Sequence, residues 1–235
     1  TRLGPIALSL LAKRWPVTRP AVAKTALDAL LAKAKVPGHA PAIAFEKTFG
    51  VLSFPDYGAG RSWRKSGEPS WLVGAAECLS SDIGFRAPGK RKLVPVLYTT
   101  NDYVAYLAED GVAWGEDTVG DMALSVLAPN ARSMMTRILF GQHVFYCPEQ
   151  KKVELEDARG AEIAKLLRLR AVADASDATE KWWTDGTTFV LERTPARGAR
   201  STVVAWPPRG RLPALGIDDP KAKRPPPGPV TFDTV

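Results

Sequence analysis

The chain has 235 residues, of which 45% are hydrophobic and 24% are charged. This composition excludes a wholly disordered chain, a collagen, a coiled coil and a membrane bundle. The formal net charge is +7, divided as +4 over residues 1–150 and +3 over residues 151–235, so the excess forms no concentrated nucleic-acid footprint.

Cysteine content and hydropathy indicate the compartment. Two cysteines, Cys78 and Cys147, do not make a disulfide framework, which points to a reducing environment. The longest apolar run, Leu3–Ala12, falls short of the roughly 20 residues that span a bilayer, and it lacks the cleavage site of a signal peptide. We therefore expect a cytoplasmic protein that makes no contact with a membrane.

The N-terminal part predicts two helices and a strand. Apolar residues at helical spacing predict a helix over residues 21–35, and a second helix is expected over 41–49. Gly50 is expected to supply a left-handed cap to the second helix. Residues 51–54 are too few for a helix and predict a strand, and the glycine-rich stretch 56–70 predicts a loop.

The middle of the chain predicts a β-meander. Residues 93–99 predict a strand in which Pro95 marks an edge or a bulge. Strands are also expected over 103–107 and 112–114, because Asp110-Gly111 between apolar runs is a good hairpin signal. The three strands should be adjacent and antiparallel.

Two helices are expected to follow the meander. A break at residues 115–117 precedes a predicted helix over 118–127, and a second helix is expected over 131–140, ended by Gly141. The second helix carries an apolar stripe that contains two methionines, which is typical of core packing.

The C-terminal part predicts a helix, a pair of strands and a tail. Residues 158–170 predict an amphipathic helix with an inward face of Ile163, Leu166 and Leu167. Residues 187–192 and 201–206 predict an antiparallel pair of strands. From residue 207 onward, prolines and basic residues predict an extended or disordered tail.

These elements together predict an α+β fold: an antiparallel sheet flanked by helices, followed by a C-terminal helix plus β-hairpin extension and a Pro-rich tail. The expected divisions are an N-terminal segment, a main domain, the extension and the tail, over residues 1–19, 20–148, 149–206 and 207–235.

Motifs of catalysis are missing from the sequence. It has no phosphate loop, no nucleophile elbow and only two histidines, so we expect no cofactor and no metal site. The group His143, Cys147 and Glu149 is better explained by a core thiol and a satisfied histidine than by a nucleophile with its base. We expect Cys147 to be buried and inert, since its neighbours are apolar. An unrecognised enzyme site around Cys147, His143 and the loop 56–70 stays open.

Aromatic residues favour binding. Seven tryptophans are present, and aromatic side chains on loops are enriched in protein interfaces. Carboxylates follow the expected hairpin and would set the register against a partner. The candidate partner-binding residues are Trp63, Trp71, Trp114, Glu116, Asp117 and Asp121. The alternative is that the tryptophans belong to the core.

The chain resembles the SUKH superfamily, which includes the yeast cell-wall synthesis regulator and many bacterial immunity proteins of toxin systems. The resemblance covers residues 20–142. The residues that carry it are Phe45-Glu46-x-x-Phe49-Gly50, Val94-Pro95-Val96, the run from Tyr103 to Trp114, and Leu139-Phe140-Gly141. It implies an α+β domain that binds and neutralises a protein toxin, with no catalytic residues to transfer.

Three functions remain at the level of sequence. The first is a cytoplasmic immunity protein, whose positive charge would suit a toxin with an acidic face. The second is a nucleic-acid-binding accessory protein, supported by a pI of about 9.5 and the basic tail. The third is an enzyme or toxin domain with an unrecognised site.

Overall fold

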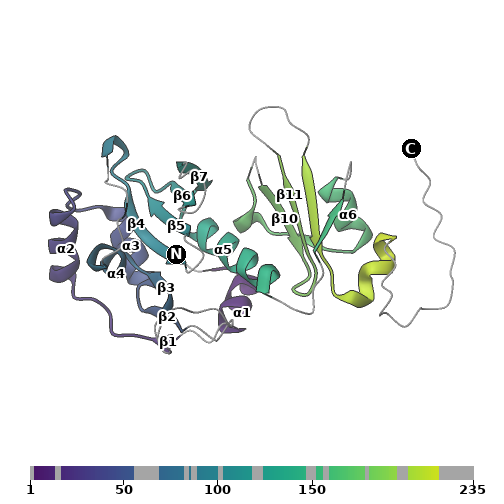
Figure 1. Ribbon diagram of the computed structural model, residues 1–235, viewed down its shortest axis with the longest axis horizontal. Coiled ribbons are helices and arrows are strands. Elements are labelled where there is room, and N and C mark those ends of the chain that lie inside the picture. The colour runs from purple at the N-terminus through teal and green to yellow at the C-terminus, as the bar shows by residue number, and fades with distance from the viewer. Residues whose placement is uncertain are drawn as a thin grey trace. The chain divides into compact units, whose positions relative to one another are not determined.

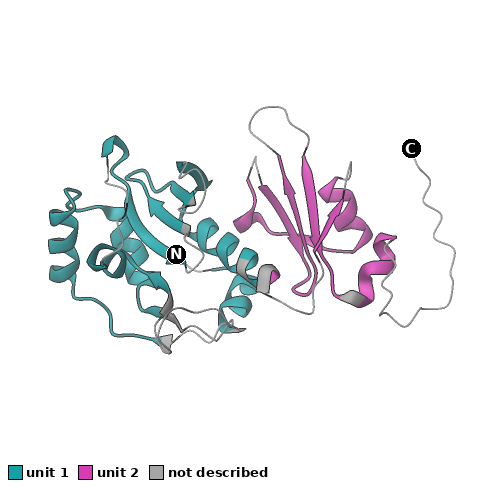
Figure 2. Cartoon of the chain, in the orientation of Figure 1, with its two compact units in different colours: residues 1–143 teal, residues 144–235 magenta. Residues whose placement is uncertain are grey.

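The computed structural model describes residues 3–13, 17–55, 69–81, 85, 89–99, 103–117, 124–146, 152–155, 159–177, 180–194 and 201–216. The chain divides into two compact units, residues 1–143 and 144–235 (Figure 2). Each unit combines helices with an antiparallel sheet, so the predicted α+β fold is confirmed.

The first unit holds a seven-stranded sheet with helices (Figure 1). Its helical elements are α1 (Pro5–Lys13), α2 (Lys24–Lys33), α3 (Ala40–Phe49), α4 (Ala75–Ser80), the 3-10 helix η1 (Gly89–Arg91) and α5 (Ala131–Tyr146), which runs past the unit boundary. Its strands are β1 (Val17–Thr18), β2 (Leu52–Pro55), β3 (Pro69–Val73), β4 (Val94–Thr99), β5 (Tyr103–Leu107), β6 (Ala113–Asp117) and β7 (Leu124–Ala128). The strands lie in chain order, each antiparallel to the next, which confirms the predicted meander of β4, β5 and β6.

The main core lies where the helices pack on one face of this sheet. Leu31 of α2, Phe45 of α3 and Met134 of α5 are fully buried against strand residues such as Leu97. Leu3, just before α1, and Ala7 within α1 belong to the same core, so residues 1–19 are part of this unit rather than a separate N-terminal segment. The opposite face of the sheet carries a smaller hydrophobic cluster around Tyr98, Val104 and Tyr106.

The Phe-Glu-x-x-Phe-Gly motif closes the end of α3 through a buried carboxylate. Oε2 of Glu46 accepts a hydrogen bond from the Ala76 backbone N–H at 3.1 Å, at the start of α4. A Cβ atom at Gly50 would overlap this carboxylate, and one at Gly74 would lie 2.6 Å from Oε2. The guanidinium of Arg19 donates to the Gly50 carbonyl beside it. The glycines are therefore needed for room around Glu46.

Two glycines do not act as the sequence predicted. Gly50 has φ −63° and ψ −11°, a right-handed conformation, and its N–H donates to the Glu46 carbonyl; the predicted left-handed cap is wrong. Gly141 does not end α5, which continues to Tyr146. A helix tolerates a glycine at a modest cost when apolar residues such as the buried Val144 follow it.

Strand pairing decides two further predictions, one at Pro95 and one for the residues after β6. Pro95 lies at a register shift between β4 and β5, which confirms the bulge, but β4 is paired on both sides, so it is not an edge strand. The predicted helix over 118–127 is wrong in its described part, because residues 124–128 form β7. β6 continues through Gly115 and Asp117 instead of breaking there, and it supplies the partner strand for β7.

The second unit is larger than the predicted helix and hairpin. It contains β8 (Val153–Leu155), α6 (Gly160–Leu166), β9 (Arg170–Ala171), η2 (Ala173–Ala175), β10 (Glu180–Thr184), β11 (Phe189–Arg193), β12 (Thr202–Trp206) and η3 (Arg209–Leu215). The antiparallel sheet has the order β8-β12-β11-β10-β9, so β11 and β12 pair as predicted but within five strands. α6 packs on one face through Ala164 and Leu167, whereas Leu166, expected to face inward, is 50% exposed.

The segment after β12 is folded where it is described. Residues 209–215 form η3, and Leu212 within it is fully buried, so the predicted extended tail is wrong for residues 207–216. Oδ2 of Asp185, in the turn between β10 and β11, accepts from Nη1 of Arg211 at 2.6 Å. This contact joins η3 to the sheet. The tail prediction for residues 217–235 lies outside the described residues.

Candidate functional site

The second face of the seven-stranded sheet brings together a row of side chains at its β7 edge. Tyr106 of β5 pairs with Trp114 of β6, and Trp114 pairs with Val126 of β7. Directly opposed residues of an antiparallel sheet project from the same face. Tyr106 is buried, Trp114 is partly exposed and Val126 is 57% exposed, so the row opens toward the edge of the sheet.

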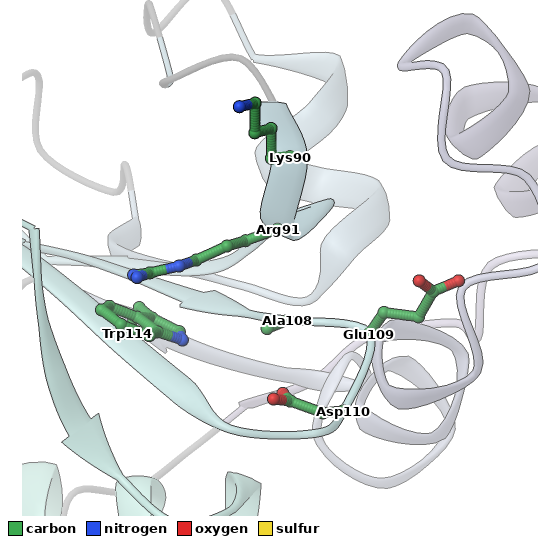
Figure 3. A pocket seen from close by; sticks show the side chains of 6 residues that line it. All are labelled: Lys90, Arg91, Ala108, Glu109, Asp110 and Trp114. Carbon is green, nitrogen blue, oxygen red and sulfur yellow. The ribbon is translucent and has the colours of Figure 1, made fainter.

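A cation lies directly on the aromatic ring in this row. The guanidinium carbon of Arg91 is 3.9 Å from the centre of the Trp114 ring, within the range of a cation–π contact. Arg91 is the last residue of η1, and the left-handed residues Gly89 (φ 56°) and Lys92 (φ 48°) bracket that turn. The turn therefore directs the Arg91 side chain over the sheet, as Figure 3 shows.

Arg91 and Trp114 line a pocket of about 500 Å³. Its lining consists of Lys90, Arg91, Ala108, Glu109, Asp110 and Trp114. In Figure 3 the side chains of Lys90 and Glu109 point away from the Trp114 ring on different sides, and Asp110 comes from the turn after β5. The pocket thus has an aromatic wall under a guanidinium, with a cationic side and an acidic side.

The charges of the pocket differ in whether they have partners. Glu109 pairs with Lys92 at 2.8 Å, and Asp110 accepts from the Val112 backbone N–H at 3.0 Å. Lys90 and Arg91, by contrast, have no hydrogen-bond acceptor among the described residues. The buried Nε1 of Trp114 likewise has no acceptor there. The two cations are therefore exposed without a protein acceptor among the described residues, while each carboxylate has at least one donor.

Compared with protein-family models, curated proteins and solved structures, the chain matches none.

His39 connects the start of α3 to the residue that follows η1. Its Nδ1 accepts from the Ala42 N–H at 3.2 Å and caps α3, which places the ring proton on Nε2. Nε2 then donates to the Lys92 carbonyl at 2.9 Å. Burial lowers the pKa of His39 below its usual 6.5, although the Lys92 carbonyl and Glu109 act in the opposite direction. The neutral ring thus ties α3 to the residue after Arg91.

Glu116 is not the exposed carboxylate that the sequence predicted. It is 3% exposed, and its Oε2 accepts from the Tyr106 hydroxyl at 2.9 Å. It pairs across the sheet with Leu124 and Val104, so it lies within the smaller hydrophobic cluster. A carboxylate buried in this way holds the Tyr106–Trp114 row in place rather than setting a register with a partner.

Trp71 is also removed from the candidate set. It is 5% exposed and packs in the main core, on the face of the sheet opposite to Trp114. The core alternative raised by the sequence is therefore right for Trp71. Asp117 is the last residue of β6, on the strand that carries Trp114. Trp63 and Asp121 lie outside the described residues.

The residues weighed for catalysis lie elsewhere. Cys78 is fully buried in α4, and burial raises the pKa of its thiol well above the usual value, so it is a poor nucleophile. His143 is partly buried in α5, and the predicted burial of Cys147 lies outside the described residues. Within the described ranges, no three His, Cys, Asp or Glu side chains gather closely enough to hold a metal ion.

No helix within the described part of the chain has the length and apolar character needed to cross a bilayer.

Sequence reasoning found Trp114 but missed Arg91 and Lys90. The run Lys90-Arg91-Lys92 reads as solvated gatekeepers before a strand, and it is exposed as expected. Only the pairing of β4 with β5 and β5 with β6 brings this run above the Trp114 ring. Gly89 ahead of the basic run was the local sign of a tight turn.

Proposed function

We propose that the chain is a non-catalytic cytoplasmic binding protein of the SUKH immunity type, which binds a protein toxin and neutralises it. The observation that carries the proposal is the Arg91–Trp114 pair in the lining of the pocket. Tryptophan and arginine are the residues most enriched among interface hot spots, particularly at positions that a partner can desolvate.

The surroundings of the pair support a binding role. Val126 beside Trp114 extends the apolar surface toward β7, which is an edge strand of its sheet. The strands that form this surface belong to the stretch that resembles the SUKH superfamily. Glu46 and Gly50 of the resembling motif also have a definite structural role, since they connect α3 to α4.

The test is co-expression with the product of the gene adjacent to this one in its genome, scored by growth rescue and by calorimetric titration of the purified proteins. Trp114→Ala is expected to weaken binding about 30-fold or more, as the loss of a hot spot of 2 kcal/mol or more requires. Lys47→Gln, on the exposed side of α3, is the control and should bind as the parent does.

Stability must be measured on the same variants. A loss of affinity that only follows the fraction of unfolded protein would contradict the proposal, because a packing defect impairs every property alike. Tight, steeply salt-dependent binding of duplex DNA, with no effect on any toxin, would favour the nucleic-acid alternative instead.

A further inference from the structure

We infer that the pocket beside Trp114 is a binding site for a carboxylate group, which an acidic side chain of the protein partner supplies. This inference rests on the proposed function and names the chemistry that the partner must present. It begins from the imbalance between donors and acceptors in the pocket.

The charged groups of the pocket without a protein partner are its two cations. Lys90 and Arg91 are exposed and carry charged N–H groups that meet no acceptor among the described residues. An unsatisfied donor costs about 1–3 kcal/mol when it is removed from water. A ligand that closes over this pocket must therefore bring acceptors, and an anionic acceptor suits two cations best.

The acidic groups of the pocket each have a protein donor already. Glu109 is paired with Lys92, and Asp110 accepts from Val112 within its own turn. These interactions leave the cationic side as the side with unused binding capacity. A basic ligand would have to approach Arg91 and Lys90 against their charge.

Arg91 is held in a geometry suited to a carboxylate. The guanidinium carbon of Arg91 lies 3.9 Å from the centre of the Trp114 ring, and the planar guanidinium has five N–H donors, which the ring does not use as hydrogen-bond donors to an oxygen. These donors match the two oxygens of a carboxylate in a bidentate contact. Because Trp114 already restricts the side chain, less conformational entropy is lost on binding.

The flanking charges favour a single acidic side chain over a nucleic acid. A polyanionic backbone requires a continuous basic track, whereas Glu109 and Asp110 line the same pocket as the two cations. The pocket of about 500 Å³ admits one side chain with its adjoining backbone. An acidic surface on the partner also agrees with the net charge of +7 on this chain.

The test uses the full ¹⁵N-labelled chain and follows the indole Nε1–H resonance of Trp114, assigned by its loss in Trp114→Phe. The probe is the capped tripeptide acetyl-Ala-Glu-Ala-amide, with acetyl-Ala-Gln-Ala-amide as its neutral match. We expect a saturable shift of the Trp114 resonance with the glutamate peptide in the millimolar range and none with the glutamine peptide.

Three variants locate the site. Arg91→Gln should lower the affinity for the glutamate peptide at least fivefold. Arg91→Lys should lower it less, because the charge remains although the planar guanidinium is lost. Lys47→Gln removes the same charge from an exposed position on α3 and should leave the affinity unchanged. A loss in Lys47→Gln equal to that in Arg91→Gln would overturn the inference, since only net charge would then matter.

Other anions decide the source of the ligand. Inorganic phosphate or an oligo-dT strand that shifts Trp114 at lower concentration than the glutamate peptide would replace the carboxylate assignment. No shift with the glutamate peptide would also overturn it. If that happens while Trp114→Ala still abolishes toxin binding, the proposed function stands without the carboxylate; if the peptide binds but the parent chain neither binds nor neutralises a toxin, the proposed function fails instead.

Discussion

Oδ2 of Asp185 accepts a hydrogen bond from Nη1 of Arg211 at 2.6 Å and so attaches η3 to the turn between β10 and β11. Burial by itself raises the pKa of Asp185, but hydrogen bonds from Thr188, Thr187 and Arg211 outweigh burial and hold that pKa at about 2, below the usual 3.8. The ionised carboxylate therefore stabilises the second unit.

The first prediction concerns this carboxylate. The pKa of Asp185 is lower in the folded chain than in the unfolded chain. Its contribution to the free energy of unfolding is therefore complete above about pH 3.8 and is lost as the pH falls toward 2. Asp185→Asn should lower the free energy of unfolding by about 1–2 kcal/mol at pH 7, measured by urea denaturation. The difference from the parent should close between pH 4 and pH 2. Glu154→Gln, which removes an exposed carboxylate from the same unit, should leave the urea midpoint unchanged, and a pH-independent difference for Asp185→Asn would contradict the prediction.

The second prediction concerns His39. Its folded pKa lies below 6.5, so the unfolded chain takes up a proton first, and stability should fall as the pH drops below 6.5. Protonation also removes the Nδ1 acceptor that caps α3. His39→Asn keeps a capping acceptor, and its urea midpoint should change less with pH between pH 7.5 and 5 than that of the parent. The chain has two histidines, so His143→Gln serves as the comparison; a pH dependence that disappears in His143→Gln instead would refute the assignment to His39.

The third prediction separates the core from the pocket. Trp71→Ala empties part of the main core and should lower the free energy of unfolding by about 3–5 kcal/mol. Trp114→Ala removes a partly exposed ring and should lower it by a clearly smaller amount, with a correspondingly smaller shift in melting temperature. Equal losses in the two variants would mean that Trp114 serves packing rather than recognition.

The fourth prediction compares two glycines that are both in right-handed backbone. A Cβ at Gly50 would overlap the Glu46 side chain and approach the Glu46 carbonyl at 2.6 Å, so Gly50→Ala should be destabilising. A Cβ at Gly141 meets nothing within 4 Å, so Gly141→Ala should stabilise α5 by about 0.5–1 kcal/mol. Thermal unfolding of the two variants should shift in opposite directions, and shifts of the same sign would show that room around Glu46 does not limit Gly50.

The elements that the sequence predicted well are those with local signals. The turn Asp110-Gly111 and the alternating strands beside it are specified by neighbouring residues, and the structure has Gly111 at φ 84° as such a turn requires. The stretch 124–127 was predicted as helix because its own residues do not distinguish helix from strand. Its strand conformation follows from pairing with β6, which no local pattern reveals.

The residues of the candidate site likewise differ in whether a local sequence signal predicts them. An aromatic residue beside a hairpin drew attention to Trp114, whereas its contact with Arg91 depends on two strand registers. Glu116 was misassigned because a carboxylate near a turn is usually solvated, and the Tyr106 hydroxyl that satisfies it comes from the neighbouring strand. Burial of a charged side chain is decided by tertiary partners, so sequence position alone did not predict it.

The order of strands in the second unit has a consequence for synthesis of the chain. β8 pairs with β12, while β9, β10 and β11 lie between them in the sequence. As the chain leaves the ribosome, Val153–Leu155 must wait for about 50 further residues before Val203–Ala205 emerges to pair with it. In the seven-stranded sheet each strand pairs with the next strand of the sequence, so none has to wait for three other strands, although α2 and α3 separate β1 from β2. A nascent chain halted before residue 201 would thus carry a complete first sheet and an unpaired β8.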